Sequence, residues 1–418
     1  MNDITPTAVG QAPLGHGHGQ NFGGLSRPVH SALRTAGPAV LAQALQMTRA
    51  RTLGLMQAWQ DALPDLSVPP LSGMNPPVWE WGHIAWFQEW WTVRNRQRFW
   101  GTRSARSGDV FDASLLPHAD ALYNSSEVAH DSRWALALPD LQQTRAYMAE
   151  VQQRSLDHLH ALQDLQAAAS DEALYFWRLV LQHEDMHNEA SVYMAQALGL
   201  HLPQVWCARP VVPQGDAGHD RSLAQLNVPA QTWTLGHQGL GFAFDNECHA
   251  HPVAVAALEV DALPVSWARY LPFVQATGHA LPPHVRYVPG GDWQVQRFGQ
   301  WQAMDLHSPV VHVSAHDAQA WCQWAGRRLP TEAEWECAVH TAGFVWGQVW
   351  EWTASAFAPY PGFEAHPYRD YSEPWWHQHR VLRGACAATS AHVVDVRYRN
   401  FFVPERRDIF AGFRSVKL

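Results

Sequence analysis

The stretch DEALYFWRLVLQHEDMHNEASVYMAQAL, residues 171–198, repeats apolar residues at the i, i+3, i+4 and i+7 spacing of an amphipathic helix. Three further stretches between about Gly37 and Leu200 share this period, at residues 39–63, 78–99 and 141–168. Four such helices predict a bundle. The connection between the second and third helices, about residues 101–139, is longer than bundle loops usually are, which favours a loop that serves a site.

The last of these stretches carries a histidine pair with metal-binding spacing. His183 and His187 are four residues apart, so their imidazoles lie about 40° apart around the helix and can share one ion. A third ligand is expected from another helix, and His83 lies among aromatic residues where a buried imidazole needs a polar or metallic partner. Glu189 lies about 160° around the helix from His187, which favours a supporting contact over metal ligation. We therefore predict His83, His183 and His187 as metal ligands.

Three neutral imidazoles without a thiolate suit Zn(II), Fe(II), copper or nickel, so the ligand types do not select the metal. Three protein ligands leave coordination positions open, which is typical of catalytic sites. The residues alone therefore indicate a metalloenzyme.

The second half of the chain has a different pattern. From about Val228, short β-like runs alternate with Gly, Pro, Asn and Asp clusters, which predicts an irregular α+β domain. Helix caps place two helices within it, one from Ser314 to Gly326 and one that begins with the Thr331–Glu334 capping box. The chain is therefore predicted to be α+β, with a flexible Gly-rich tail (1–35), the bundle (36–200), a linker (201–227) and the second domain (228–418). In the tail, His16 and His18 are expected to make weak metal contacts at most.

Composition excludes several classes of function. The 418 residues include 29 basic and 38 acidic side chains, a net charge of −9, which argues against nucleic-acid and membrane partners. There is no run of about 18 apolar residues and no signal-peptide pattern, so we expect a cytoplasmic protein. The five cysteines are scattered and form no CxxC pair, which predicts structural thiols in a reducing compartment.

Both halves resemble known domains. The HxxxHxE helix, together with an upstream bundle histidine, is similar to DinB-type metal-binding bundles. The second half resembles the formylglycine-generating-enzyme domain, a variant of the C-type-lectin fold. The strings that carry this second resemblance are FDNECHAHPV (244–253), LPVSWARYLPFV (263–274), GRRLPTEAEWE (326–336), GQVWEWTAS (347–355), RVLRGA (380–385) and RYRNFFVPERRDIFAGFR (397–414).

The two domains in this order resemble one family, the non-heme iron sulfoxide synthases of ergothioneine biosynthesis and the related selenoneine synthases. The resemblance implies Fe(II) on His83, His183 and His187, O2 as the oxidant, and hercynine as a substrate whose imidazole C2 gains a bond to a chalcogen. Formylglycine generation is disfavoured, because that activity needs a pair of C-terminal cysteines and only Cys386 lies in this region.

The resemblance also suggests the substrate contacts. The Asn-aromatic pair that the family uses for the trimethylammonium group of hercynine corresponds to Asn400 and Phe401. The next residue is Asp in enzymes that use γ-glutamylcysteine, but here it is Phe402, so no carboxylate is present to pair with a donor amine. We therefore expect a neutral selenosugar donor and selenoneine as the product. The alternative is sulfoxide synthesis from cysteine or γ-glutamylcysteine.

The proton donor is less well defined by the sequence. The tyrosine that the family carries after its WEWT string corresponds to Phe363 here, although Tyr360, Tyr368 and Tyr371 lie near it. We predict Tyr123, from the long bundle loop, as the catalytic tyrosine. Two other classes remain as alternatives: a non-catalytic sugar- or partner-binding module of the C-type-lectin kind, and a DinB-type thiol S-transferase that acts without oxygen.

Overall fold

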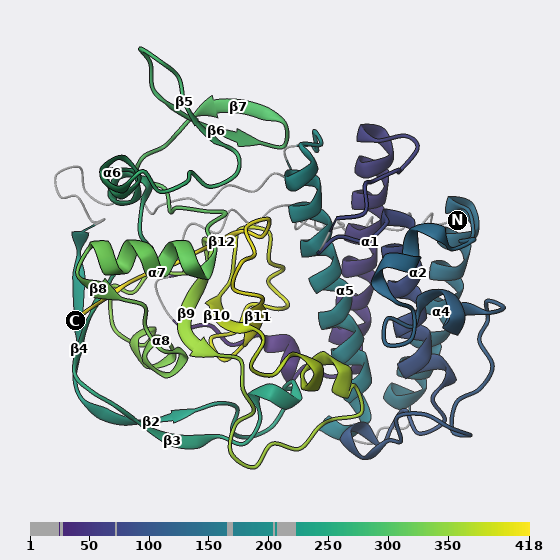
Figure 1. Ribbon diagram of the computed structural model, residues 1–418. Coiled ribbons are helices and arrows are strands. Elements are labelled where there is room, and N and C mark those ends of the chain that lie inside the picture. Colours follow the sequence, from purple (N-terminus) through teal and green to yellow (C-terminus); the bar gives the residue numbers. More distant parts are fainter. Residues whose placement is uncertain (1–24, 26–27, 72, 165–169, 204, 207–222) are drawn as a thin grey trace, which may run out of the picture.

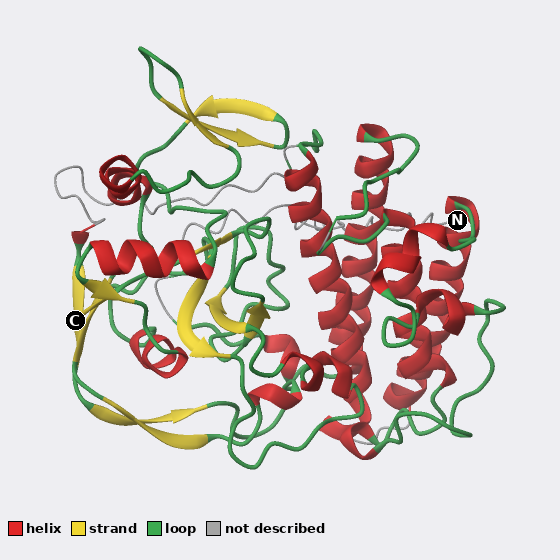
Figure 2. Cartoon of the chain, in the orientation of Figure 1, coloured by secondary structure: helices red, strands yellow, loops and turns green. Residues whose placement is uncertain are grey.

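The computed structural model describes residues 25, 28–71, 73–164, 170–203, 205–206 and 223–418. The N-terminal part is helical and the C-terminal part contains the β-sheets, and the two parts lie side by side (Figure 1). Figure 2 shows that nearly all long helices belong to the first part, while the second mixes strands, short helices and loops. The predicted α+β class is confirmed.

Four long helices form the N-terminal domain, and each corresponds to one of the predicted stretches. The helix with the histidine pair begins after Ser170, whose Oγ accepts a hydrogen bond from the Ala173 N–H, and ends at Gly199, where φ is 67°. The long helices are α1 (Pro38–Ala62), α2 (Pro77–Gln88), α4 (Leu141–Asp164) and α5 (Asp171–Leu198), and the short elements are η1 (Ala32–Arg34), η2 (Glu89–Arg94), η3 (Gly101–Arg103), α3 (Ala119–Tyr123) and η4 (His130–Ala135).

The second long helix ends earlier than the apolar period predicts. After α2 the chain makes the π-helical turn η2 and leaves the helix at Asn95, which has an extended backbone. The N–H of Arg96 then donates to the carbonyl of Val110 at 2.8 Å. Pairing with the long loop has therefore replaced the helical hydrogen bonds that residues 95–99 would have made.

The C-terminal domain contains four small sheets. Two are four-stranded, in the orders β1-β4-β13-β8 and β11-β10-β9-β12, and all their neighbours are antiparallel except β9 and β12. The elements are β1 (Gln225–Val228), β2 (Gln231–Leu235), η6 (Asp245–Glu247), β3 (His251–Val255), β4 (Leu258–Asp261), α6 (Trp267–Thr277), β5 (Val285–Tyr287), β6 (Trp293–Arg297), β7 (Gln300–Ala303), α7 (Ala315–Trp324), β8 (Arg327–Arg328), α8 (Glu332–Ala338), β9 (Trp350–Ala356), η7 (Arg369–Tyr371), η8 (Glu373–Trp375), β10 (Arg380–Gly384), β11 (Asn400–Phe402), β12 (Ala411–Gly412) and β13 (Val416–Lys417).

Both helices predicted from their caps are present. The Ser314 hydroxyl accepts from the Asp317 N–H at 3.1 Å at the start of α7, and Thr331 does the same for Glu334 at 3.2 Å at the start of α8. In each case the acidic side chain accepts from the backbone N–H of the capping residue, which completes a capping box.

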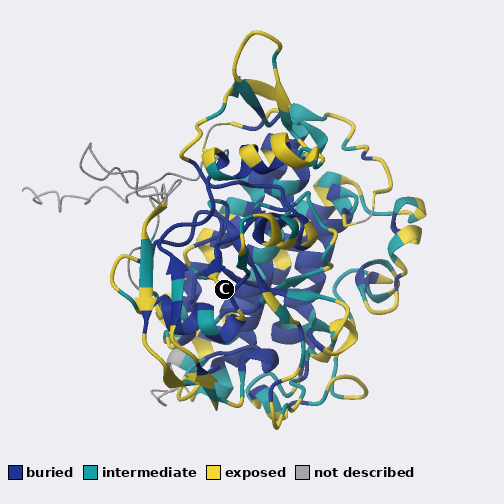
Figure 3. Ribbon diagram, turned by 60° about the vertical axis from the view of Figure 1, so that its left-hand side comes forward, coloured by how far each residue is buried: buried dark blue, intermediate teal, exposed yellow. Residues whose placement is uncertain are grey.

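Helix α5 lies against the C-terminal domain (Figure 1). Glu189 accepts a hydrogen bond from the Trp350 indole of β9 at 2.6 Å, and the Gln182 amide donates to the carbonyl of His392 at 2.9 Å. One cluster of buried apolar residues continues from the bundle into the second domain, and Figure 3 shows buried segments running through the centre of the molecule. The helix that carries two predicted ligands is therefore fixed by contacts with both domains.

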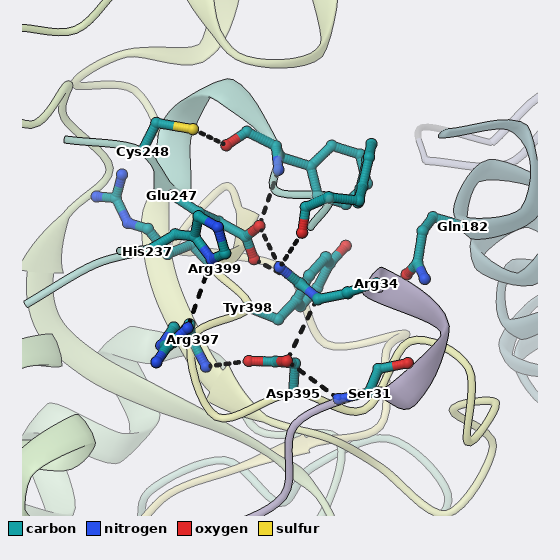
Figure 4. A network of polar contacts seen from close by, with 12 residues as sticks. Ser31, Arg34, Gln182, His237, Glu247, Cys248, Asp395, Arg397, Tyr398 and Arg399 are labelled. Carbon is teal, nitrogen blue, oxygen red and sulfur yellow. Dashed lines mark hydrogen bonds and ion pairs between the residues drawn. The ribbon is translucent and has the colours of Figure 1, made fainter. Parts of the chain in front are cut away.

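Residues 28–35 were expected to belong to the flexible tail, but they pack against the C-terminal domain. The Arg34 guanidinium is buried between the carboxylates of Glu247, at 2.8 Å, and Asp395, at 3.3 Å (Figure 4). The backbone N–H of Ser31 also donates to Asp395 at 3.1 Å. This segment has the composition of a loop, but its one arginine pairs with two buried acids.

His16, His18, Cys207 and most of the predicted linker lie outside the described residues. Strand β1 begins at Gln225, inside that predicted linker. Cys248, Cys322, Cys337 and Cys386 carry free thiols, and burial raises the pKa of each. Among the described helices, none has the length and hydropathy that a membrane crossing requires.

Candidate metal centre

The structure brings His83, His183 and His187 together inside the bundle. His83 comes from α2 and the other two come from successive turns of α5. One potential ligand atom from each lies within 4.8 Å of the other two, and the Nε2 atoms of His183 and His187 are 3.2 Å apart. Two nitrogens that each bind one ion at about 2.1 Å, at an angle near 100°, lie about this far apart.

Contacts on the far side of two of these rings orient them. The Nδ1–H of His83 donates to the carbonyl oxygen of Tyr123 at 2.8 Å. The Nδ1–H of His187 donates to a carboxylate oxygen of Glu80, which lies one turn before His83 on α2. Because Nδ1 carries the proton in both rings, the lone pair of each Nε2 is free to bind a metal. The donor set therefore fits a divalent transition-metal ion.

The cluster is enclosed on most sides by aromatic rings. The Trp79 ring stacks on His83 with 4.9 Å between centroids, and Phe87 stacks on His183 at 3.6 Å. Burial lowers the pKa of His83 to about 3 and also lowers that of His183, so both rings stay neutral at physiological pH. Neutral imidazoles are the form that binds metal.

A pocket of about 210 Å³ adjoins the cluster at His187 and lies between the two domains. His187 is the most exposed of the three candidate ligands, at 20% of its side chain. The bundle side of the wall consists of α5, and the other side comes from β9, β11 and the segments before β10 and β11. The lining residues are Met186, His187, Glu189, Ala190, Tyr193, Trp350, Tyr371, Val393, Tyr398, Asn400, Phe401 and Phe402.

The three residues predicted as substrate contacts all line this pocket. Asn400, Phe401 and Phe402 form β11, at the edge of the second four-stranded sheet. Phe401 stacks on Phe357 at 3.9 Å, and the guanidinium of Arg406 lies over the Phe402 ring at 4.6 Å. The wall at Phe402 is therefore aromatic, with a cation beside it.

Tyr123 lies next to the cluster but does not line the pocket. Its ring packs on Gly82, where an added Cβ would be 2.2 Å from the ring, and its buried hydroxyl has no hydrogen-bond partner among the described residues. Its backbone carbonyl is the acceptor for His83. The role of its hydroxyl stays a prediction.

Two other tyrosines, Tyr371 and Tyr398, do reach the pocket. Their hydroxyl oxygens are 2.9 Å apart, and the Tyr398 oxygen lies 3.0 Å from the sulfur of Met186, the residue before His187. Burial raises the pKa of both phenols above the ordinary value, so both keep their protons at neutral pH. From the sequence, Tyr371 was only one of three tyrosines near Phe363, and Tyr398 was not a candidate.

Glu80 is the other functional candidate that sequence reasoning missed. The available signal was its spacing, three residues before His83, which places both on one face of α2. Glu189 was expected to contact a neighbouring helix or to support a metal ligand, but it accepts from Trp350 of the other domain. Trp81, Trp86 and Trp90, which lie near His83 in the sequence, do not line the pocket.

The domain comparisons agree with this architecture. Residues 44–190 match the DinB superfamily, and residues 220–348 and 344–418 match the sulfatase-modifying factor enzyme 1-like domain. A DinB-type bundle with a three-histidine cluster, joined to a sulfatase-modifying-factor domain, therefore defines the class of protein.

Relatives of full length narrow this class. The chain is 30% identical over 447 residues to the hercynine oxygenase of Mycolicibacterium smegmatis, covering 90% of this chain and 97% of the relative. It is also 30% identical over 444 residues to the hercynine oxygenase of Mycobacterium tuberculosis, with 90% and 98% covered. The formylglycine-generating enzyme of Streptomyces coelicolor matches only 32% of this chain and 54% of its own length, at 33% identity. The protein belongs to the hercynine oxygenase family and is an enzyme.

Proposed function

We propose that this protein is a non-heme iron enzyme that uses O2 to join a chalcogen donor to C2 of the imidazole of hercynine. The donor that we favour is a selenosugar, and the product is then selenoneine. The observation that carries this proposal is the pocket between the domains, which reaches a candidate metal ligand at one end and has an aromatic wall. The full-length hercynine oxygenase relatives support the same substrate.

The composition of the pocket wall suits a substrate with a quaternary ammonium group. A trimethylammonium group cannot donate N–H hydrogen bonds and is best held by aromatic faces and anionic oxygens. Six of the twelve lining residues are aromatic and one, Glu189, is acidic, while none of the twelve is Lys or Arg. Asn400 and Phe401 are the proposed contacts to this group.

Phe402 favours a donor without a free amine. A donor ammonium placed there would be desolvated against an aromatic edge and would find no carboxylate at position 402. The Arg406 guanidinium, 4.6 Å from the Phe402 ring, is itself paired with Asp408. A neutral sugar carries no such charge. The donor preference therefore rests on Phe402.

The reaction requires the enzyme to hold two substrates and to manage protons. Coupling a C2–H bond and a chalcogen–H bond with O2 gives a C2–chalcogen bond with one oxygen on the chalcogen and one water, which reduces O2 by four electrons. When the donor is a selenosugar, selenoneine then forms by cleavage of the selenium–sugar bond. Iron held by His83, His183 and His187 would supply the route for these electrons. The pocket would orient the hercynine imidazole toward the donor and exclude water, a proximity effect.

The Tyr371–Tyr398 pair is a suitable proton source at the pocket wall. One hydroxyl donates to the other, so the remaining O–H hydrogen has only the weak acceptor Met186 Sδ among the described contacts. This hydrogen can be given to a reacting oxygen or nitrogen in the pocket as that atom gains negative charge. Tyr123 remains the competing candidate.

A competition between donors tests the substrate assignment. Iron-loaded protein is given hercynine, O2 and equal amounts of selenosugar, cysteine and γ-glutamylcysteine, and the products are quantified by mass spectrometry. We expect the selenium product to dominate. A preference of about tenfold for either amino-acid thiol, equal to about 1.4 kcal/mol of transition-state stabilisation, would establish the sulfur alternative.

A further inference from the structure

The carboxylate of Glu80 links two helices at the metal cluster. Glu80 is buried on α2, and one of its oxygens accepts the Nδ1–H of His187 on α5. The other oxygen accepts from the Asn75 amide at 2.5 Å. Both carboxylate oxygens are therefore engaged, and the side chain has a defined position relative to the ring.

A single arginine supports this carboxylate and also the ring packed on His83. Arg133 donates to the Asn75 oxygen at 2.7 Å, which orients the Asn75 amide toward Glu80. Its guanidinium also lies 4.0 Å from the Trp79 ring centroid, and Trp79 in turn stacks on His83. Arg133 comes from η4 in the long loop between α2 and α4. This loop therefore supports His187 through Asn75 and Glu80, and His83 through Trp79.

The three candidate ligands differ in their supporting contacts. His83 donates to a neutral backbone carbonyl, and His183 packs face to face on Phe87. Among the described contacts, only His187 is hydrogen-bonded to a carboxylate. A carboxylate behind a ligating imidazole fixes the ring orientation, makes the nitrogen at the metal more basic and adds a negative charge near the ion.

We propose that Glu80 is a positioning residue that sets both the metal affinity and the oxidation-state preference of this centre through His187. The proposal rests on the metal site of the proposed function but not on its substrates. The added negative charge stabilises the ferric ion more than the ferrous ion, since the electrostatic gain grows with ionic charge. The residue therefore lowers the Fe(III)/Fe(II) potential.

Two substitutions separate the charge from the hydrogen bond. Glu80→Gln keeps an acceptor for the His187 N–H but removes the charge, whereas Glu80→Ala removes both. Anaerobic competition with a chromophoric chelator should show Fe(II) affinity lower by tenfold or more in both variants. The midpoint potential of Glu80→Gln, measured by spectroelectrochemistry, should be more positive than that of the unmodified protein.

Glu89, nine residues after Glu80 at the start of η2, provides a matched control. It is fully buried, and its carboxylate accepts from Ser114, Leu115 and Tyr147 rather than from a candidate metal ligand. Glu89→Gln should keep the Fe(II) affinity within about twofold and leave the potential unchanged. Fe(II) affinity within twofold of normal in Glu80→Gln, together with an unchanged potential, would overturn the proposal.

If Glu80→Gln does not fold, Asn75→Ala replaces it, because this variant removes only the amide that holds Glu80. It should weaken Fe(II) binding by a smaller factor, and an unchanged affinity would again contradict the proposal. These readouts are independent of hercynine. A protein that binds iron as described but does not turn over hercynine refutes the proposed function and leaves the role of Glu80 intact.

Discussion

Two of the candidate ligands, His83 and His183, are neutral for a local reason. Burial among Trp79, Phe87 and the neighbouring rings disfavours imidazolium, and the Nδ1–H donors of His83 and His187 leave Nε2 free. The Nε2 atoms of His183 and His187 lie 3.2 Å apart. This spacing suits two nitrogens that share one cation.

The first prediction therefore concerns metal stoichiometry. Anaerobic titration of the apoprotein with ferrous ion should reach one equivalent, and His183→Ala or His187→Ala should abolish binding, because two nitrogens from the remaining rings do not hold the ion. Calorimetry measures both. One equivalent of tightly bound iron in a double variant that combines His183→Ala and His187→Ala would exclude this cluster as the metal site.

The tyrosine pair gives the second prediction. Tyr398→Phe removes the hydroxyl between Tyr371 and Met186, so turnover should fall by about 10²- to 10⁴-fold, the range for loss of general acid catalysis. Iron binding should be unchanged, which titration checks. If Tyr123→Phe instead loses turnover by this factor while Tyr398→Phe does not, Tyr123 is the proton donor and the Tyr371–Tyr398 pair is not.

At the scale of elements, periodicity and caps predicted most of the helical structure. The four long helices and the boxes at Ser314 and Thr331 depend on contacts between residues close in sequence, so a local pattern encodes them. The spacing of His183 and His187 is local in the same way. The end of the α2–η2 helical stretch after Arg94 was missed, because it depends on pairing with Val110 in the long loop.

The segment of residues 28–35 was also mispredicted, because its position depends on contacts with residues even farther away in the sequence. Its position depends on Arg34 meeting Glu247 and Asp395, which lie more than 200 residues away along the chain. Figure 4 shows the arginine between these acids. Nothing in the Gly-rich composition around it predicts which distant acids it will reach.

The third prediction tests this ion-pair cluster. Burial raises the pKa of Asp395, but the Arg34 charge and the hydrogen bond from His30 outweigh it and hold the pKa well below its usual value. Such a carboxyl contributes stability above its unfolded-state pKa, about 3.9, and loses it as the pH falls. Asp395→Asn should lower the free energy of unfolding at pH 7 by about 3 kcal/mol.

Urea denaturation at pH 7, 4 and 3 measures this effect. The difference between Asp395→Asn and the unmodified protein should narrow as the pH is lowered from 4 to 3, because the carboxyl of the unfolded chain is then protonated while the native carboxylate stays ionised, so unfolding takes up a proton. Asp131→Asn, at a fully exposed acid, serves as the control and should change stability little. A difference that is absent at pH 7, or constant with pH, would contradict the role of this ion pair.

For the whole molecule, the important feature is that the pocket belongs to neither domain alone. Helix α5 supplies His187 and Glu189, while the C-terminal domain supplies Trp350, Tyr398 and the strand β11. Sequence patterns within each half could suggest the residues of one wall. Their juxtaposition follows from long-range packing across the shared core, so Tyr398 and Glu80 emerged only from the structure.

Oxygen uptake tests the central claim most directly. Ferrous-loaded protein in an oxygen electrode should consume O2 only when hercynine and a chalcogen donor are both present, and His187→Ala should show no uptake under the same conditions. A sugar- or partner-binding module, or a thiol S-transferase, would consume none. If no oxygen disappears with hercynine and any of the selenosugar, cysteine or γ-glutamylcysteine donors, the oxidative function proposed for this protein is wrong.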